Sequence, residues 1–110
     1  MKAPNIERAF IDVEKLRLYA LNPEHPEGRH KARVFLAALG ISACDTEWLA
    51  GQILARLPGS QVRQGQTDQY GRRFEVDVRL TRGSRSAVVR TAWIIRVGED
   101  IPRLATCFVV

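Results

Sequence analysis

The sequence is poor in cysteine and has no long hydrophobic run. Its two cysteines, Cys44 and Cys107, stand far apart without metal-type spacing, so they predict neither a disulfide framework nor a zinc site. No apolar stretch approaches the ~20 residues of a membrane span. The opening residues MKAPNIERAF lack the apolar core of a signal peptide. We therefore expect a cytoplasmic protein, or a domain delivered by a larger system, with no membrane partner.

The motifs of several enzyme classes are missing as well. The chain contains no GxGxxG, P-loop, HExxH or GxSxG pattern. These patterns would supply phosphate-binding loops, zinc ligands or a nucleophilic serine, so nucleotide-dependent phosphoryl transfer, zinc proteolysis and α/β-hydrolase chemistry have no support. His25 and His30 lie close in sequence, but no third ligand accompanies them. We expect neither a cofactor nor a metal.

Positive charge is what the sequence has in excess. Its 110 residues include 17 Lys or Arg and 12 Asp or Glu, which gives a net charge of +5. All nine basic side chains of residues 61–110 are arginines. Because the planar guanidinium suits phosphate and base-edge contacts, this half of the chain favours a nucleic acid, RNA in particular, as partner. Arg-rich codon usage in a GC-rich genome would explain the same count.

The hydrophobic pattern predicts one α+β domain, residues 1–110, with residues 1–8 as a loose N-terminal arm. Helical spacing predicts helices over residues 13–21, 28–39 and 46–57. The N-cap candidates of the first and third helices are Asp12 and Asp45. Period-two alternation then predicts strands near residues 61–66, 72–80, 86–97 and 103–110. We expect three N-terminal helices packed on one face of a four-stranded antiparallel sheet.

The second predicted helix is both amphipathic and basic. Its apolar stripe consists of Ala32, Phe35, Leu36 and Leu39. Lys31 and Arg33 fall on the other side, so we expect both to face solvent. His30 stands at the start of this helix. It is either a general acid that projects beside the sheet, since histidine titrates near neutral pH, or an ordinary surface histidine.

One predicted strand separates charged from apolar residues. In RRFEVDVRL the apolar parity holds Phe74, Val76, Val78 and Leu80. The charged parity holds Arg73, Glu75, Asp77 and Arg79. In the next predicted strand, Arg90 and Arg96 point to the same side as each other, and we expect this side to be the one that carries the charged row. Such a face is either a solvated surface or a phosphoryl-transfer site without a metal, with Glu75 as general base and arginines stabilising the charge on phosphorus.

An exposed aromatic residue is expected in the turn before this strand. The stretch TDQYGRRF (67–74) places Tyr70 before Gly71, which suits a positive φ, and near two arginines. Tyr70 either stacks on a nucleic-acid base or covers the sheet edge. The candidate nucleic-acid contacts are Lys31, Arg33, Tyr70, Arg72, Arg73 and Arg96.

Three blocks carry a resemblance: KLRLYALNPEHPEGRHKARVFLAALG, DQYGRRFEVDVRL and VRTAWIIRVGEDIPRLATCFVV. In this order they resemble a family of small, uncharacterised bacterial domains, from about residue 9 to the end. The resemblance implies a protein that occurs alone, sometimes beside a small partner gene, or as the C-terminal module of a polymorphic toxin. The predicted topology also resembles the barnase–EndoU–colicin–RelE class of metal-independent ribonucleases, in which catalysis occurs on the open sheet face.

The leading hypothesis is a toxin-type, metal-independent endoribonuclease that acts on RNA from the charged sheet face. Its catalytic candidates are His30, Glu75, Arg79 and Arg90. The alternative is a non-catalytic module that binds nucleic acid or a protein partner in a toxin or partner operon. Both allow a small cognate antitoxin or immunity protein, and two open sheet edges allow a homodimer. The orientation of His30 discriminates between these two hypotheses. A histidine over the sheet near Glu75 favours the ribonuclease, and a histidine in solvent favours the binding module.

Overall fold

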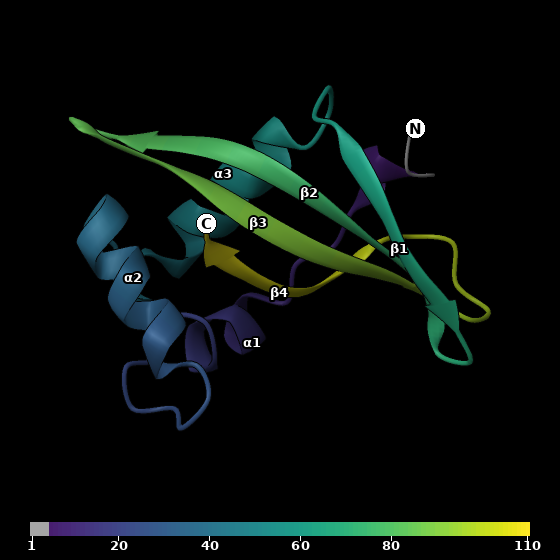
Figure 1. Ribbon diagram of the computed structural model, residues 1–110, viewed down its shortest axis with the longest axis horizontal. Helices are drawn as coiled ribbons and strands as arrows, with labels where there is room; N and C mark the ends of the chain where they lie inside the picture. Colours follow the sequence, from purple (N-terminus) through teal and green to yellow (C-terminus); the bar gives the residue numbers. More distant parts are fainter. Residues whose placement is uncertain (1–4) are drawn as a thin grey trace.

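The computed structural model describes residues 5–110 and shows an α+β architecture (Figure 1). The helical elements of these residues are η1 (Ile6–Arg8), α1 (Val13–Leu18), α2 (Arg29–Leu39), η2 (Ala43–Asp45) and α3 (Thr46–Arg56). The strands are β1 (Val62–Asp68), β2 (Gly71–Arg82), β3 (Arg85–Arg96) and β4 (Arg103–Val109). They form one antiparallel sheet in the order β1-β2-β3-β4. The predicted class, the three helices and the four-stranded antiparallel sheet are confirmed.

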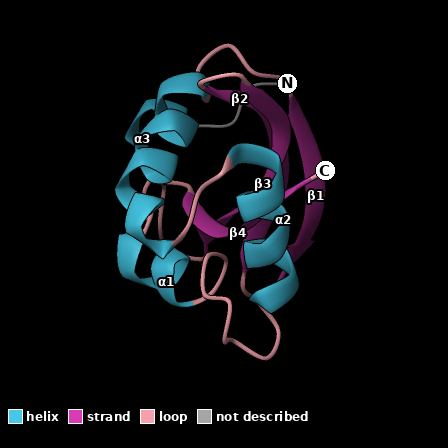
Figure 2. Ribbon diagram, turned by 90° about the vertical axis from the view of Figure 1, so that its left-hand side faces the viewer, coloured by secondary structure: helices cyan, strands magenta, loops and turns pink. Residues whose placement is uncertain are grey.

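The helices differ in how they meet the sheet. α2 contacts β3 and β4, and α3 contacts β2, whereas α1 packs mainly against α3 and η2 (Figure 2). The expectation that all three helices pack on one face of the sheet therefore holds only in part. Of the expected N-terminal arm, residues 1–4 lie outside the described part of the chain, and Ile6–Arg8 form η1.

Side-chain caps fix two helix starts. The Asp12 carboxylate accepts a hydrogen bond from the Lys15 backbone N–H at 3.2 Å, which confirms it as the N-cap of α1. The sequence predicts the same role for Asp45 at the third helix, but Asp45 makes no cap bond to α3. Its carboxylate instead accepts a hydrogen bond from the Ser42 N–H at 3.0 Å, as part of a capping box at the N-terminus of η2. Because this 3-10 turn leads directly into α3, the capping interaction lies at Ser42, upstream of the predicted position.

The core lies on the apolar parity of β2 and β3. Val76, Val78, Leu80 and Val89 are almost fully buried, and Trp93 is only 1% exposed. This confirms the alternation read from the sequence. The prediction for Leu36 of α2 is wrong, because this side chain is 55% exposed. α2 buries a narrower stripe than predicted, which consists of Ala32, Phe35 and Leu39.

The loop between α1 and α2 is a compact turn that is organised by His25. Its Nδ1 atom accepts hydrogen bonds from the backbone N–H groups of Glu27 and Gly28, each at 3.0 Å. The His25 ring packs edge-on against the Tyr19 ring, with 4.7 Å between centroids. A side chain at Gly28 would clash with the carbonyl oxygen of Tyr19. His25 therefore has a structural role in this loop.

Residues 5–110 hold neither a single membrane-spanning helix nor a metal-type cluster. No one helix there has the length and apolarity to cross a membrane, although the bent pair Arg29–Leu39 and Ala43–Arg56 meets these criteria jointly, by length and composition only. The same residues contain no group of three or more His, Cys, Asp or Glu that could hold a metal ion. Cys44 is exposed and Cys107 is buried, and burial raises the pKa of the Cys107 thiol to about 12.

Candidate nucleic-acid interface

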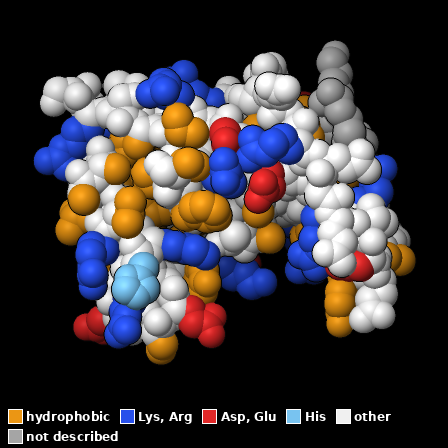
Figure 3. All heavy atoms as spheres, viewed as in Figure 1, with side chains coloured by type: hydrophobic (Ala, Val, Ile, Leu, Met, Phe, Trp, Pro, Cys, Tyr) orange, Lys and Arg blue, Asp and Glu red, His pale blue; other side chains and the backbone are white. Residues whose placement is uncertain are grey.

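The charged parity of β2 and β3 faces away from the core. In Figure 1 the sheet lies in front of α3, so the same view in Figure 3 shows the face of the sheet turned away from that helix. Basic and acidic side chains gather in the middle of this face. Asp77 stands directly opposite Arg90 of β3, and Glu75 stands opposite Arg63 of β1. Cross-strand neighbours of opposite charge are thus in contact.

Asp77 is held by two guanidinium groups. Arg90 donates to both of its carboxylate oxygens, from Nε at 3.0 Å and from Nη2 at 3.2 Å. Arg63 donates to the same two oxygens, from Nη2 at 3.1 Å and from Nη1 at 3.2 Å. Arg63 also reaches Glu75 with 3.2 Å between Nη2 and Oε1. We call these four residues, Arg63, Glu75, Asp77 and Arg90, the central network.

The central network is electrically balanced. Hydrogen bonds from Arg90 and then from Arg63 lower the pKa of Asp77 to about 2. The Asp77 carboxylate in turn raises the pKa of both arginines. A carboxylate with so low a pKa is a weak base at neutral pH, since a general base works best with a pKa near the operating pH. Carboxylates already occupy the two arginine forks, so the centre of this face holds no open phosphate clamp.

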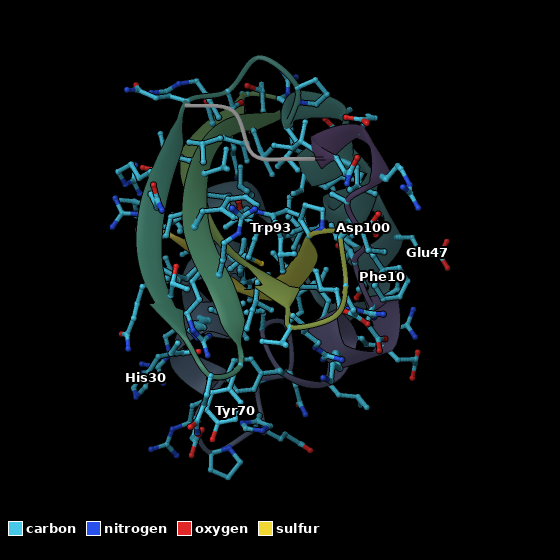
Figure 4. The ribbon with its side chains drawn as sticks, turned by 90° about the vertical axis from the view of Figure 1, so that its right-hand side faces the viewer. Phe10, His30, Glu47, Tyr70, Trp93 and Asp100 are labelled. Carbon is cyan, nitrogen blue, oxygen red and sulfur yellow. The ribbon has the colours of Figure 1, made fainter. Side chains whose placement is uncertain are left out.

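The four catalytic candidates do not meet in one site. Glu75 and Arg90 belong to the central network, and Arg79 follows on β2, where its Nη1 lies 3.4 Å from Ser86 Oγ. The His30 side chain is exposed and makes no hydrogen bond or ion pair within residues 5–110. Figure 4 shows His30 projecting outward at the periphery of the molecule. The structure therefore joins Glu75 and Arg90 and leaves His30 in solvent, which is the arrangement expected of the binding alternative.

Three of the candidate contacts gather where the β1–β2 turn meets the end of β3. Tyr70 is 62% exposed in that turn, and its carbonyl oxygen accepts from the Val97 N–H at 3.1 Å. Gly71, which has a φ of 148°, pairs with Arg96 across the sheet. Arg72 and Arg96 are exposed, and within residues 5–110 neither has an ion-pair partner. We call Tyr70, Arg72 and Arg96 the Tyr70 end.

The acidic residues near the Tyr70 end are engaged elsewhere. Asp68 accepts from the Tyr70 N–H at 2.9 Å and lies 3.4 Å from Arg73 Nε, so it fixes the turn and neutralises Arg73. The Tyr70 N–H bond is the main cause of the lowered pKa of Asp68. Glu99 binds Arg103 at 2.9 Å. A pocket of about 390 Å³ adjoins these groups and includes Arg72 and Arg96 in its lining. The lining also includes the carboxylates of Asp68, Glu99 and Asp100, and Asp100 lies 3.8 Å from Arg8. Each of these three carboxylates thus has an arginine partner other than Arg72 or Arg96.

The two α2 candidates behave differently. Arg33 is exposed, as predicted. The sequence predicts that Lys31 faces solvent as well, but it is half-buried: its Nζ donates to Thr106 Oγ1 at 3.0 Å and to the Tyr19 hydroxyl at 3.3 Å. The prediction for Lys31 is wrong because α2 lies along β4, which covers one flank of the helix.

Sequence reasoning missed Arg63 and gave Asp77 no site role, although both belong to the central network. Asp77 could have been found from the charged parity of β2. Arg63 could not, because a regular hairpin through the Thr67–Arg72 pair would place it opposite Val76, on the core side. A register shift between Gln64 and Thr67 places it opposite Glu75 instead.

Comparison with known families decides the affiliation of the chain. A family model described as "Domain of unknown function (DUF6883)" matches residues 2–110. The chain belongs to the DUF6883 family. No curated protein and no solved structure matches it. The recognised blocks therefore mark an uncharacterised domain family, and the toxin context and the ribonuclease-like architecture stay predictions for this DUF6883 domain.

Proposed function

We propose that this DUF6883 domain is a non-catalytic module that binds single-stranded nucleic acid, RNA in particular, at the Tyr70 end. One observation carries the proposal: Arg72 and Arg96, which have no ion pair among residues 5–110, lie at the same end of the sheet as the exposed Tyr70. Aromatic side chains stack on bases that are not already stacked in a duplex, and arginines beside them bind the backbone phosphates. The net charge of +5 strengthens the attraction of a polyanion over longer distances.

The state of the catalytic candidates supports binding over cleavage. A metal-independent ribonuclease needs a base, an acid and free cations around one phosphate. In this fold Glu75, the candidate base, is ion-paired with Arg63 at 3.2 Å, and Arg90 is committed to Asp77. His30, the candidate acid, projects into solvent from α2. The toxin-type endoribonuclease is therefore the second outcome that the experiments must separate.

Binding is tested by fluorescence anisotropy with a labelled single-stranded RNA at several salt concentrations. We expect Arg72→Gln plus Arg96→Gln to weaken binding and to lower the slope of log K against log[salt] by roughly 0.7 for each phosphate interaction that the variant removes. Tyr70→Ala should weaken binding by about 1–3 kcal/mol without changing that slope. Arg56→Gln is the control, because Arg56 is an exposed arginine of α3, away from this end. Equal weakening per arginine removed, in Arg56→Gln and in the variant with Arg72→Gln plus Arg96→Gln, would show diffuse attraction and contradict the site.

Cleavage is tested by incubating the purified domain with total RNA in EDTA. We expect the RNA to stay intact. Degradation that disappears in Glu75→Gln and in Arg90→Gln would favour the ribonuclease hypothesis and overturn the non-catalytic proposal. Degradation that persists in both variants would point to a contaminant, and the RNA must then stay intact after further purification for the proposal to stand.

Partner proteins belong to the same proposal. The toxin context that the resemblance implies predicts a small antitoxin or immunity protein, encoded beside the domain. A homodimer is predicted through a sheet edge, and β1 is an edge strand of this sheet. Co-expression with the neighbouring gene and light scattering of the purified domain test these two predictions separately.

A further inference from the structure

Lys31 is a half-buried cation without a carboxylate partner among residues 5–110. Its ammonium donates to Thr106 Oγ1 and to the Tyr19 hydroxyl, and it lies 4.7 Å from the centroid of the Tyr19 ring. A lysine ammonium has three N–H donors, so one donor has no protein acceptor among these residues. A charge that is partly removed from water attracts an anion more strongly than an exposed one does.

The ammonium lines a pocket between α1, α2 and β4. Figure 2 shows β4 between these two helices. The pocket has a volume of about 330 Å³, near the lower end of the ~300–1,000 Å³ range of small-molecule sites. Its polar lining includes Lys15, Lys31, Tyr19 and Thr106. Its apolar lining includes Leu16, Ala20 and Leu104. A few converging polar groups over an apolar surface are the usual composition of a ligand pocket.

The charges of the pocket define the ligand. Lys15 and Lys31 supply two positive charges, and Asp12 supplies one negative charge. Asp12 is occupied at the start of α1, where it accepts from the Lys15 N–H. The sum of +1 is matched by a monoanion, whereas a second negative charge on the ligand would be repelled by Asp12. The two hydroxyls of Tyr19 and Thr106 add polar partners near the head group.

We propose that this pocket binds a small organic carboxylate. One carboxylate oxygen accepts the third N–H of Lys31, Lys15 adds attraction from the rim, and a compact apolar body lies against Leu16 and Leu104. The site is separate from the Tyr70 end and does not depend on nucleic-acid binding. Lys31 thus serves a ligand site in addition to joining α2 to β4.

The test uses benzoate as the probe in a ¹H–¹⁵N NMR titration of the full chain. We expect saturable shifts of the amide signals of Tyr19, Lys31 and Thr106. Benzyl alcohol has a similar body without the charge and should leave these signals in place. Phenyl phosphate, which is largely dianionic at pH 8, should bind several-fold more weakly than benzoate. Equal or tighter binding of phenyl phosphate would overturn the carboxylate assignment, and absence of benzoate shifts would overturn the site.

Variants separate a ligand site from a purely structural lysine. Lys31→Met keeps an unbranched apolar stem and removes the charge, so we expect benzoate affinity to fall at least tenfold. Arg33→Met removes the same charge from the exposed side of α2 and should leave affinity unchanged. If Lys31→Met does not fold, the exposed Lys15→Met variant replaces it and should bind several-fold more weakly. Unchanged affinity in the folded lysine variants overturns the proposal, and Arg72→Gln plus Arg96→Gln must leave benzoate binding intact.

Discussion

Arg90 of β3 stands directly opposite Asp77 of β2 in the sheet register. Its guanidinium group donates one hydrogen bond to each oxygen of the Asp77 carboxylate, at 3.0 and 3.2 Å. Arg63 of β1 occupies the same two oxygens from the other side. One carboxylate therefore links three neighbouring strands. It also neutralises Arg90, one of the arginines for which the sequence suggested a phosphate site on this face.

The Asp77 pair makes a specific contribution to acid stability. Its pKa of about 2 lies below the ordinary 3.8, so the contribution is complete above about pH 4 and is lost as the pH falls toward 2. We expect Asp77→Asn to cost roughly 1–2 kcal/mol at pH 7, less than the full shift implies because the group keeps contact with water. Urea unfolding followed by circular dichroism between pH 7 and pH 2.5 measures this. Asp100→Asn, at a far more exposed carboxylate, is the control, and equal pH slopes for both variants would contradict the prediction.

The same substitution should change polyanion binding in the opposite direction. Asp77→Asn removes the carboxylate that occupies Arg63 and Arg90, so we expect tighter RNA binding with a steeper salt dependence. Glu47→Gln, at an exposed carboxylate of α3, changes the net charge by the same amount without freeing these two arginines. Anisotropy titrations of both variants at one ionic strength compare them. A similar gain in both would mean that net charge alone acts, and the arginines of the central network would then have no binding role.

Thr91 is a buried residue of β3 whose hydroxyl group hydrogen-bonds two other buried groups. Its hydroxyl donates to the Val76 carbonyl at 2.6 Å and accepts from the Trp93 indole N–H at 2.8 Å. We expect Thr91→Val to destabilise the fold by about 1–3 kcal/mol, because it leaves a buried indole N–H without an acceptor. Thr81→Val on the exposed side of β2 should change stability by less than about 0.5 kcal/mol. Urea unfolding midpoints of the two variants test this difference.

Two glycines provide a matched pair for the loop before α2. A methyl group at Gly28 would meet the Tyr19 backbone, whereas one at Gly51 in α3 would meet nothing within 4 Å. We expect Gly28→Ala to destabilise the protein by about 1–3 kcal/mol through overpacking. Gly51→Ala should stabilise it by up to about 1 kcal/mol through helix propensity. Thermal unfolding measures both, and a destabilised Gly51→Ala protein would show that α3 is packed differently from this structure.

The fold class could be predicted because its signals are local. The change from helical spacing to period two marks where the helices give way to the sheet. The alternation of β2 alone identifies which side chains reach the core, since successive residues of a strand point to opposite faces. The same alternation places Glu75 and Asp77 on the outer face. The exposed turn at Tyr70 could be predicted for local reasons as well, because Gly71 and Asp68 favour that turn.

The candidate site depended on contacts between distant segments. Whether Lys31 meets water or Thr106 is decided by where α2 lies relative to β4, and these residues are far apart in sequence. The direction of His30 follows from the same placement of α2. Leu36 is exposed for a related reason, since the sheet covers only part of the helix surface that periodicity marks as apolar.

The sequence by itself determined the α+β class, the charged parity of the sheet and the excess of arginine, because these follow from composition and from the period of each element. Only the tertiary structure decided which charges are free. A register shift in β1 turns Arg63 toward Glu75 and Asp77, and the pairing of β2 with β3 sets Arg90 on the same carboxylate. Within residues 5–110, Arg72 and Arg96 have no such partners at the Tyr70 end. Charge can be counted along a chain, but whether a charge is neutralised depends on register and packing across strands.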